Sequence, residues 1–197
     1  GVMTALTQAL LHSNKLRHSI PSQIGSLRNL KYLVLDDNKL ESTLPNTFCN
    51  LTDLVVLSAA RNSLTGHVPS CVLQSMQVFN LADNNFHGEL PSVLNWPQLA
   101  YLLLSNNKFH GSVSALQLNG STLSSGYNEN PLVDDAYHNT HPVYYGGNLL
   151  ALTLHKNKLD KPLPRDLVLP RTLNTFTIFE NQIPGRVPHG LLSQQNG

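Results

Sequence analysis

The residues best suited to chemistry in this chain form one stretch rich in acidic residues and histidine. Asp134 and Asp135 are followed by His138 and His141, and an H-x-x-H pair near two carboxylates offers the ligand types that bind divalent metals. No matching ligand set stands elsewhere, and nine histidines in a chain with only 13% charged residues fit a polar surface. The sequence also has no phosphate-cradling glycine loop, nucleophile elbow or paired-cysteine motif. We therefore predict a protein that is not an enzyme and that needs no metal and no cofactor.

A repeated asparagine identifies the elements that must position these residues. It recurs at intervals of about two dozen residues, each time in the frame L-x-x-L-x-L-x-x-N-x-L, at Asn14, Asn38, Asn62, Asn84, Asn107, Asn130, Asn157 and Asn181. A unit of this length cannot bury its own apolar face, so the units must stack on one another. We predict one solenoid domain over 1–197 with about eight repeats, irregular at 119–148. Neither end carries a capping repeat, so we expect a longer polypeptide or neighbouring chains to cover both ends.

Each frame also predicts a short strand. Its apolar residues alternate, which buries one face of the strand, and the long return to the next frame makes successive strands parallel. The asparagine follows the strand, where its amide can bond to backbone groups of its own turn and the adjacent one. The strands are thus expected to form one continuous sheet along the inside of a curved solenoid.

The segment after each asparagine narrows the class. It has the form L-x-G-x-[ILV]-P, as in Leu64–Pro69 and Phe86–Pro91, although His18, Ser42 and Lys161 replace the glycine. Frame and turn together resemble the leucine-rich-repeat family in its plant-type form. The resemblance implies an α/β fold, a right-handed solenoid with a parallel β-sheet on the concave face and loops or 3-10 turns on the convex face. It also implies a place among receptor ectodomains or secreted inhibitor proteins.

Function should lie where the frame leaves residues free, on the outward positions of the strands. Rungs two to five align apolar side chains there that the fold does not require, and an exposed apolar area with tyrosines is typical of a protein contact. We predict a ligand-binding face at Tyr32, Val34, Asp36, Val55, Val56, Val78, Tyr101 and Leu103. The alternative is that β-branched residues at these positions merely favour a strand.

The irregular segment is a second candidate contact. Three tyrosines and two histidines lie there in an apparent loop, and loops on a rigid scaffold carry much of a protein's recognition. The candidate contact residues are Tyr137, His138, His141, Tyr144 and Tyr145. A degenerate repeat whose tyrosines pack into the core explains the same residues equally well.

Charge and apolar runs limit the partners. The net charge is +1, and the chain has no basic stripe of the kind that binds nucleic acid. No apolar run is long enough to span a membrane. A protein or peptide is the expected partner, a cell-wall glycan is possible, and a structural subunit built into a larger assembly is the alternative function.

Sequons and cysteines bear on the compartment. Asn50 and Asn119 begin N-x-[ST] patterns that accept glycan in a secretory setting, although such patterns also arise by chance. Cys49 and Cys71 stand near the turn prolines of successive repeats, where they either form a disulfide or remain two partly buried thiols. Together with the resemblance, these features predict an extracellular protein or cell-surface ectodomain.

Overall fold

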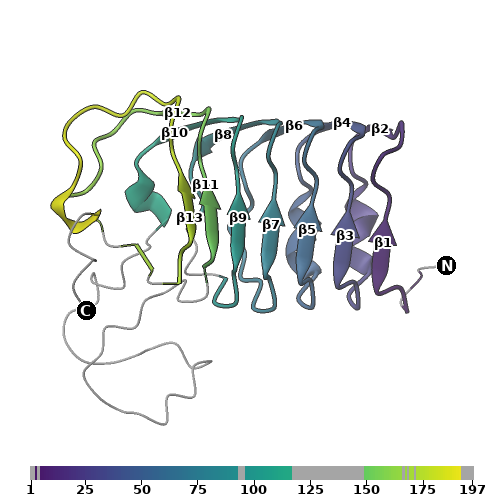
Figure 1. Ribbon diagram of the computed structural model, residues 1–197. Coiled ribbons are helices and arrows are strands. Elements are labelled where there is room, and N and C mark those ends of the chain that lie inside the picture. Colours follow the sequence, from purple (N-terminus) through teal and green to yellow (C-terminus); the bar gives the residue numbers. More distant parts are fainter. Residues whose placement is uncertain are drawn as a thin grey trace, which may run out of the picture.

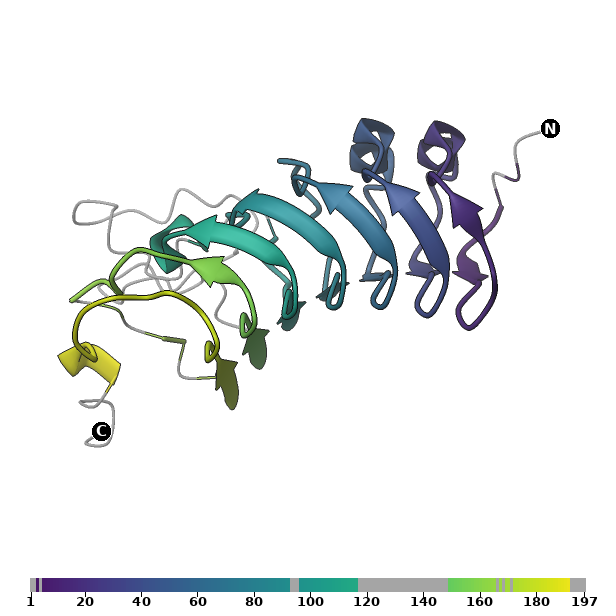
Figure 2. The same ribbon diagram turned by 90° about the horizontal axis from the view of Figure 1, so that it is seen from above.

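The computed structural model describes residues 3, 5–92, 96–116, 149–165, 167, 169–170 and 172–191. Short strands stand side by side in one parallel sheet, one from each turn of a solenoid (Figure 1). In chain order they are β1 (Gln8–Leu10), β3 (Tyr32–Val34), β5 (Val56–Ser58), β7 (Val78–Asn80), β9 (Tyr101–Leu103), β11 (Ala151–Thr153) and β13 (Thr175–Thr177). Seen from above, this sheet lines the inner side of an arc, with β1 and β13 at its two ends (Figure 2). The predicted solenoid with a concave parallel sheet is confirmed.

The core is a continuous column built from the apolar positions of the frame. Leu33, Leu57 and Leu102 lie in the middle of their strands and are at most 2% exposed. Trp96 is 2% exposed and stacks on Phe79 of β7 with ring centroids 4.7 Å apart. Because each buried side chain touches those of the turns before and after it, the stack derives its stability from contacts between turns.

A second parallel sheet covers the upper edge of the solenoid in Figure 1 and was not predicted from the sequence. Its strands are β2 (Arg17–His18), β4 (Lys39–Ser42), β6 (Ser63–Gly66), β8 (Asn85–Glu89), β10 (Lys108–Gly111) and β12 (Lys158–Leu159). The chain turns sharply at the glycine of Leu64–Pro69, where Gly66 has a φ of 88°. His18 and Ser42 replace that glycine and still adopt positive φ angles of 65° and 72°.

The convex side consists of loops and short 3-10 helices. These are η1 (Ser22–Ser26), η2 (Asn46–Asn50), η4 (Val113–Leu116) and η6 (His189–Leu191), and the described residues contain no α-helix. Cys49 at the end of η2 forms a disulfide with Cys71 of the next turn, and their Cα atoms are 5.5 Å apart. The structure thereby decides between the two states left open for these cysteines.

One predicted rung is wrong. The count of eight repeats predicted a strand before Asn130, between the frames of Asn107 and Asn157. Instead β9 pairs directly with β11, so no strand lies between them. Asn157 likewise bonds to the turn that contains β9, accepting from the Phe109 N–H at 3.0 Å. Residues 117–148 lie outside the described residues, and the extent of the single domain over 1–197 remains a prediction.

Candidate recognition surface

The concave sheet carries the predicted apolar face in the expected register. Tyr32 lies beside Val56, Val56 beside Val78, and Val78 beside Tyr101. The neighbouring column runs from Val34 through Ser58 and Asn80 to Leu103. We call the six apolar residues of these two columns the concave strip: Tyr32, Val34, Val56, Val78, Tyr101 and Leu103.

Exposure within the concave strip is concentrated at its two ends. Tyr32 is 37% exposed and Tyr101 is 40% exposed, whereas the valines between them are half-buried. Strands about 4.8 Å apart shield one another's short side chains, so the half-buried valines lie between two more exposed tyrosines. Val55, also predicted on this face, precedes β5. The Val55 and Val56 N–H groups both donate to the Lys31 carbonyl, so the regular alternation of the strand begins only at Val56.

Two polar residues interrupt the second column of the sheet. Ser58 is 8% exposed, and its hydroxyl oxygen accepts a hydrogen bond from Asn80 Nδ2 at 3.0 Å. Asn80 Oδ1 in turn accepts from the Ala82 N–H at 3.1 Å. These bonds use the polar atoms within the sheet, so the strip stays apolar on either side of them.

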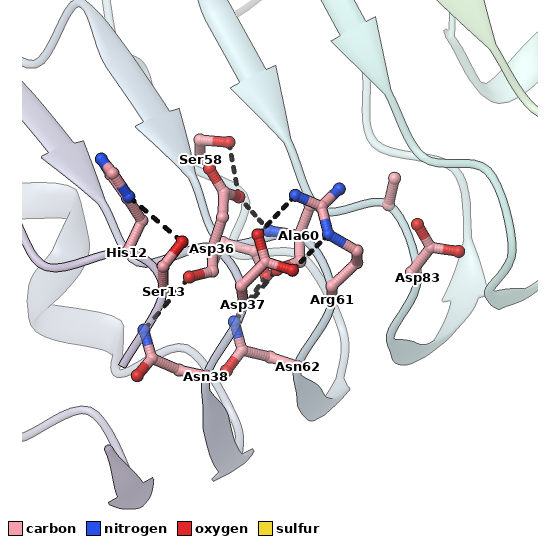
Figure 3. A network of polar contacts seen from close by, with 12 residues as sticks. His12, Ser13, Asp36, Asp37, Asn38, Ser58, Ala60, Arg61, Asn62 and Asp83 are labelled. Carbon is pink, nitrogen blue, oxygen red and sulfur yellow. Dashed lines mark hydrogen bonds and ion pairs between the residues drawn. The ribbon is translucent and has the colours of Figure 1, made fainter. Parts of the chain in front are cut away.

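Asp36 lies one alternation beyond Val34 and binds to the next turn (Figure 3). Its Oδ1 accepts from the Ser58 hydroxyl at 2.7 Å and from the Ala60 N–H at 2.6 Å. A carboxylate that accepts a backbone N–H and a hydroxyl from the adjacent turn fixes the spacing of the two turns. Asp36 therefore has a structural role in addition to its predicted place on the ligand face.

We call the repeated asparagines of the frame the ladder asparagines. The residue before each of them forms a further column at the ends of the concave strands. All seven described members have φ angles between 52° and 56°; they are Ser13, Asp37, Arg61, Asp83, Asn106, Lys156 and Glu180. This left-handed conformation turns the chain out of the sheet and projects the side chains beyond the strand ends. The column and the adjacent Asp36 thus supply the charged border of the concave strip.

Arg61 and Asp37 form the strongest contact in that border (Figure 3). Arg61 donates from Nε to Asp37 Oδ1 at 2.5 Å and from Nη2 to Asp37 Oδ2 at 2.6 Å. This pair of hydrogen bonds holds the pKa of Asp37 below its usual value and raises that of Arg61. Asp83 Oδ1 accepts instead from Asn106 Nδ2 at 2.6 Å. We call Asp36, Asp37, Arg61 and Asp83 the rim.

Several predicted residues are outside the described part of the chain. They are the loop residues Tyr137, His138, His141, Tyr144 and Tyr145 and the sequon asparagine Asn119. Asn50 is described and exposed, at the last position of η2 on the convex side. Among the described residues, no cluster of three or more His, Cys, Asp or Glu side chains could hold a metal ion.

The structure adds two exposed apolar residues to the concave side that the sequence did not select as contacts. Leu10 continues the second column onto β1 and is 57% exposed. Phe179 is 54% exposed and stacks on His155 with centroids 4.5 Å apart. Aligning the repeat frames would have identified both residues, because Leu10 then aligns with Val34 and Phe179 with Asp36.

The comparisons with known proteins agree with the repeat pattern. The family model described as "Leucine Rich Repeat" matches residues 29–51. Receptor-like protein 35 of Arabidopsis thaliana is 31% identical over 189 residues, which is 92% of this chain and 17% of that protein. The chain belongs to the leucine-rich-repeat family, in its plant-type class. It thus spans about a sixth of the length of this curated relative.

Solved structures of leucine-rich-repeat ectodomains superpose on the chain. The ectodomain of the Arabidopsis thaliana receptor kinase GASSHO1/SCHENGEN3, in complex with CASPARIAN STRIP INTEGRITY FACTOR 2, gives a TM-score of 0.78 at 30% identity, covering 95% of this chain and 20% of that one. The Arabidopsis receptor kinase HAESA, in complex with the peptide hormone IDA and the co-receptor SERK1, gives 0.68 at 29% identity, covering 95% and 32%. These neighbours are binding modules, in agreement with the prediction that this repeat region is not an enzyme. In the described part of the chain no helix has the length and hydropathy of a membrane span.

Proposed function

We propose that this chain is the recognition part of a receptor-like or secreted leucine-rich-repeat protein and that the concave strip binds a protein or peptide. The observation that carries the proposal is the pair of exposed tyrosines in one column, with Val56 and Val78 between them. Tyrosine offers a large contact area with a polar tip and is enriched in interface hot spots. Burial of the strip by a ligand would cover apolar area that the solenoid itself leaves open.

The comparisons support this proposal over the alternative of a structural scaffold subunit. The GASSHO1/SCHENGEN3 ectodomain was solved in complex with CASPARIAN STRIP INTEGRITY FACTOR 2, and HAESA with a peptide hormone and a co-receptor. The charge of the face argues against nucleic acid, because the rim holds three carboxylates and one guanidinium. A cell-wall glycan is the second candidate ligand, because aromatic side chains can stack against sugar rings.

A double substitution tests the proposal. Linear nine-residue peptides displayed on phage are selected on the purified chain, and the best binders are synthesised and titrated by calorimetry. Tyr32→Ala with Tyr101→Ala is expected to weaken their binding at least tenfold, about 1.4 kcal/mol. Val72→Ala is the matched control, because Val72 is 55% exposed but follows Cys71 on the convex side. Equal affinity of the double variant and the wild type would refute binding by the concave strip.

The same proposal includes an oxidising, extracellular or cell-surface location. The disulfide between Cys49 and Cys71 favours that location, since disulfides are rare in reducing compartments. Asn50 is exposed at the end of η2, away from the concave strip, so a glycan there would leave the ligand face open. Intact-mass analysis of secreted protein, before and after enzymatic removal of N-glycans, is expected to show a mass loss. Asn50→Gln should reduce that mass loss by one glycan. An equal mass loss in the variant and the wild type would exclude a glycan at Asn50.

A further inference from the structure

The rim directly borders the concave strip on one side. Outward positions alternate along each strand and continue one step past its end, so Asp36 follows Val34 and Ala60 follows Ser58. Ala82 occupies the same position in the next turn, after Asn80. Because alanine side chains are short, Ala60 and Ala82 do not separate the concave strip from the carboxylates of the rim. A ligand lying on the strip therefore has one flank next to the rim.

The rim is negatively charged although the chain as a whole carries a net charge of +1. Three carboxylates, Asp36, Asp37 and Asp83, face one guanidinium, which leaves two negative charges over three consecutive turns. Arg61 is committed to Asp37 through Nε and Nη2. Asp36 and Asp83 also interact electrostatically with Arg61, so the four groups share one local field.

Asp36 and Asp83 keep acceptor capacity beyond their structural bonds. In the part of the chain that the structure describes, both bonds to the Asp36 carboxylate end on Oδ1, as does the bond from Asn106 to Asp83. The second oxygen of each carboxylate makes no further hydrogen bond with these described residues. Each can accept from a charged donor, and charge-assisted bonds of this kind are about twice as strong as neutral ones.

The opposite border of the strip has a different character. The position just before each strand of rungs two to five carries Lys31, Val55, Gln77 or Ala100, which includes no carboxylate. The two borders thus differ in sign, with the acidic groups gathered at the carboxyl ends of the strands. This asymmetry favours a ligand whose positive charge lies on the rim side.

We propose that the concave strip binds an extended peptide that crosses β3 to β9 and places a lysine or arginine side chain against the rim. This inference rests on the proposed function and names the class of its ligand. Four parallel strands span about 14 Å from first to last, which four or five residues of an extended chain can cover. Apolar side chains of the peptide lie between Tyr32 and Tyr101, and the basic side chain lies near Asp36 and Asp83.

Peptide selection tests the charge requirement separately from the strip itself. The phage library of linear nine-residue peptides is selected in parallel on the wild-type chain and on Asp36→Asn with Asp83→Asn. Asparagine keeps the Oδ1 acceptor at each site, so the bonds from Ser58, the Ala60 N–H and Asn106 are retained in the variant. Glu41→Gln is the matched control, because Glu41 is an exposed carboxylate of the second sheet that pairs with His18.

Binders selected on the wild type are expected to be enriched in lysine or arginine and to weaken at least tenfold on the double variant, with a smaller effect at high salt. On Glu41→Gln they should bind as tightly as on the wild type. Wild-type binders without basic enrichment, or with equal affinity for the double variant, would overturn the charge requirement. If such peptides still lost affinity on Tyr32→Ala with Tyr101→Ala, the proposed function would stand while this inference failed.

Discussion

At the scale of single residues, the ladder asparagines connect each turn to the one before it. The Asn84 amide donates to the Ala59 carbonyl at 2.9 Å and to Leu81 at 3.2 Å, and its Oδ1 accepts from the Leu64 N–H at 2.9 Å. Five other described asparagines, Asn38, Asn62, Asn107, Asn157 and Asn181, make the same bonds across turns, and Asn84 itself is 9% exposed. One side chain thus satisfies buried donors and acceptors of two turns at once.

Replacing Asn84 by alanine is expected to lower the free energy of unfolding by about 3 kcal/mol. The substitution leaves the buried Leu64 N–H without its partner, at about 1–3 kcal/mol, and removes the shorter of the two bonds to the Ala59 carbonyl, which then accepts only from Asn62 among the described residues. Asn14→Ala is the matched control, because Asn14 is exposed and, among the described residues, its side-chain amide donates only to the Leu11 and His12 carbonyls of its own turn. Chemical denaturation of both variants gives the comparison, and equal losses would contradict a special role for bonds between turns.

The pair of Asp37 and Arg61 predicts a pH dependence at the acid end. Because Arg61 holds the pKa of Asp37 below its usual value, the unfolded chain binds this proton more readily than the folded one. The pair therefore stabilises the fold above the ordinary pKa of an aspartate, about 3.9, and this contribution is lost as the pH falls through the lower folded value. We expect NMR titration to show a higher Asp37 pKa in Arg61→Gln than in the wild type. The variant Lys39→Gln should leave the pKa unchanged, and a shift as large as that in Arg61→Gln would assign the effect to general charge.

At the scale of elements, the convex 3-10 helices pack so closely that one glycine is required. A Cβ atom added to Gly25 in η1 would lie 2.2 Å from the Thr47 carbonyl oxygen of η2. Thr47 is held in place because its hydroxyl donates to the Ser22 carbonyl at 2.6 Å. Gly25→Ala must therefore push the two helices apart, at a cost of about 1–3 kcal/mol typical of overpacking.

The neighbouring residue supplies the control for this prediction. Ser26 lies in the same 3-10 helix but is exposed, so Ser26→Ala is expected to change the melting temperature little. Calorimetric melting of Gly25→Ala should show a clear decrease relative to both Ser26→Ala and the wild type. Similar melting temperatures for the two variants would mean that η1 and η2 adjust without strain.

The elements also show how far the sequence could predict this fold. Alternation of buried leucines predicted the concave strands and their register, including Tyr32 beside Val56, because burial on one face fixes a strand to within one residue. The second sheet was missed because a segment such as Lys39–Ser42 buries only Leu40, which gives no alternating pattern. The rung around Asn130 was wrong because the step from Asn107 to Asn157 is about twice the repeat period, and counting alone supplied an extra copy.

The candidate site was predictable to a different degree. Columns of outward residues could be listed from the frame, so Tyr32 and Tyr101 were expected in one outward column, and both are exposed there. The bonds of Asp36 were not predictable, because its partners Ser58 and Ala60 belong to the next turn and depend on side-chain geometry. Pairing within a column follows from sequence spacing, whereas the choice among bonding partners requires the structure.

At the scale of the whole molecule, stability should be distributed along the stack. In a solenoid each turn contacts only its neighbours, so opening can involve some turns while others stay closed. The disulfide between Cys49 and Cys71 joins the second and third turns and should limit how far such opening extends.

Removal of that disulfide is the test of this view. Cys49→Ser with Cys71→Ser is expected to lose about 3 kcal/mol at the interface of the second and third turns, since the bond closes a loop of moderate length. Amide hydrogen exchange can follow two equivalent N–H groups, one between the bridged turns and one farther along the solenoid. The Leu40 N–H donates to Asn62 Oδ1 at 2.9 Å across the bridged turns, and the Phe109 N–H donates to Asn157 Oδ1 at 3.0 Å beyond them. The Leu40 amide should exchange much faster in the variant while the Phe109 amide keeps its rate. Equal acceleration of both amides would instead show that the solenoid opens as one cooperative unit, and contact between neighbouring turns alone would no longer account for its stability.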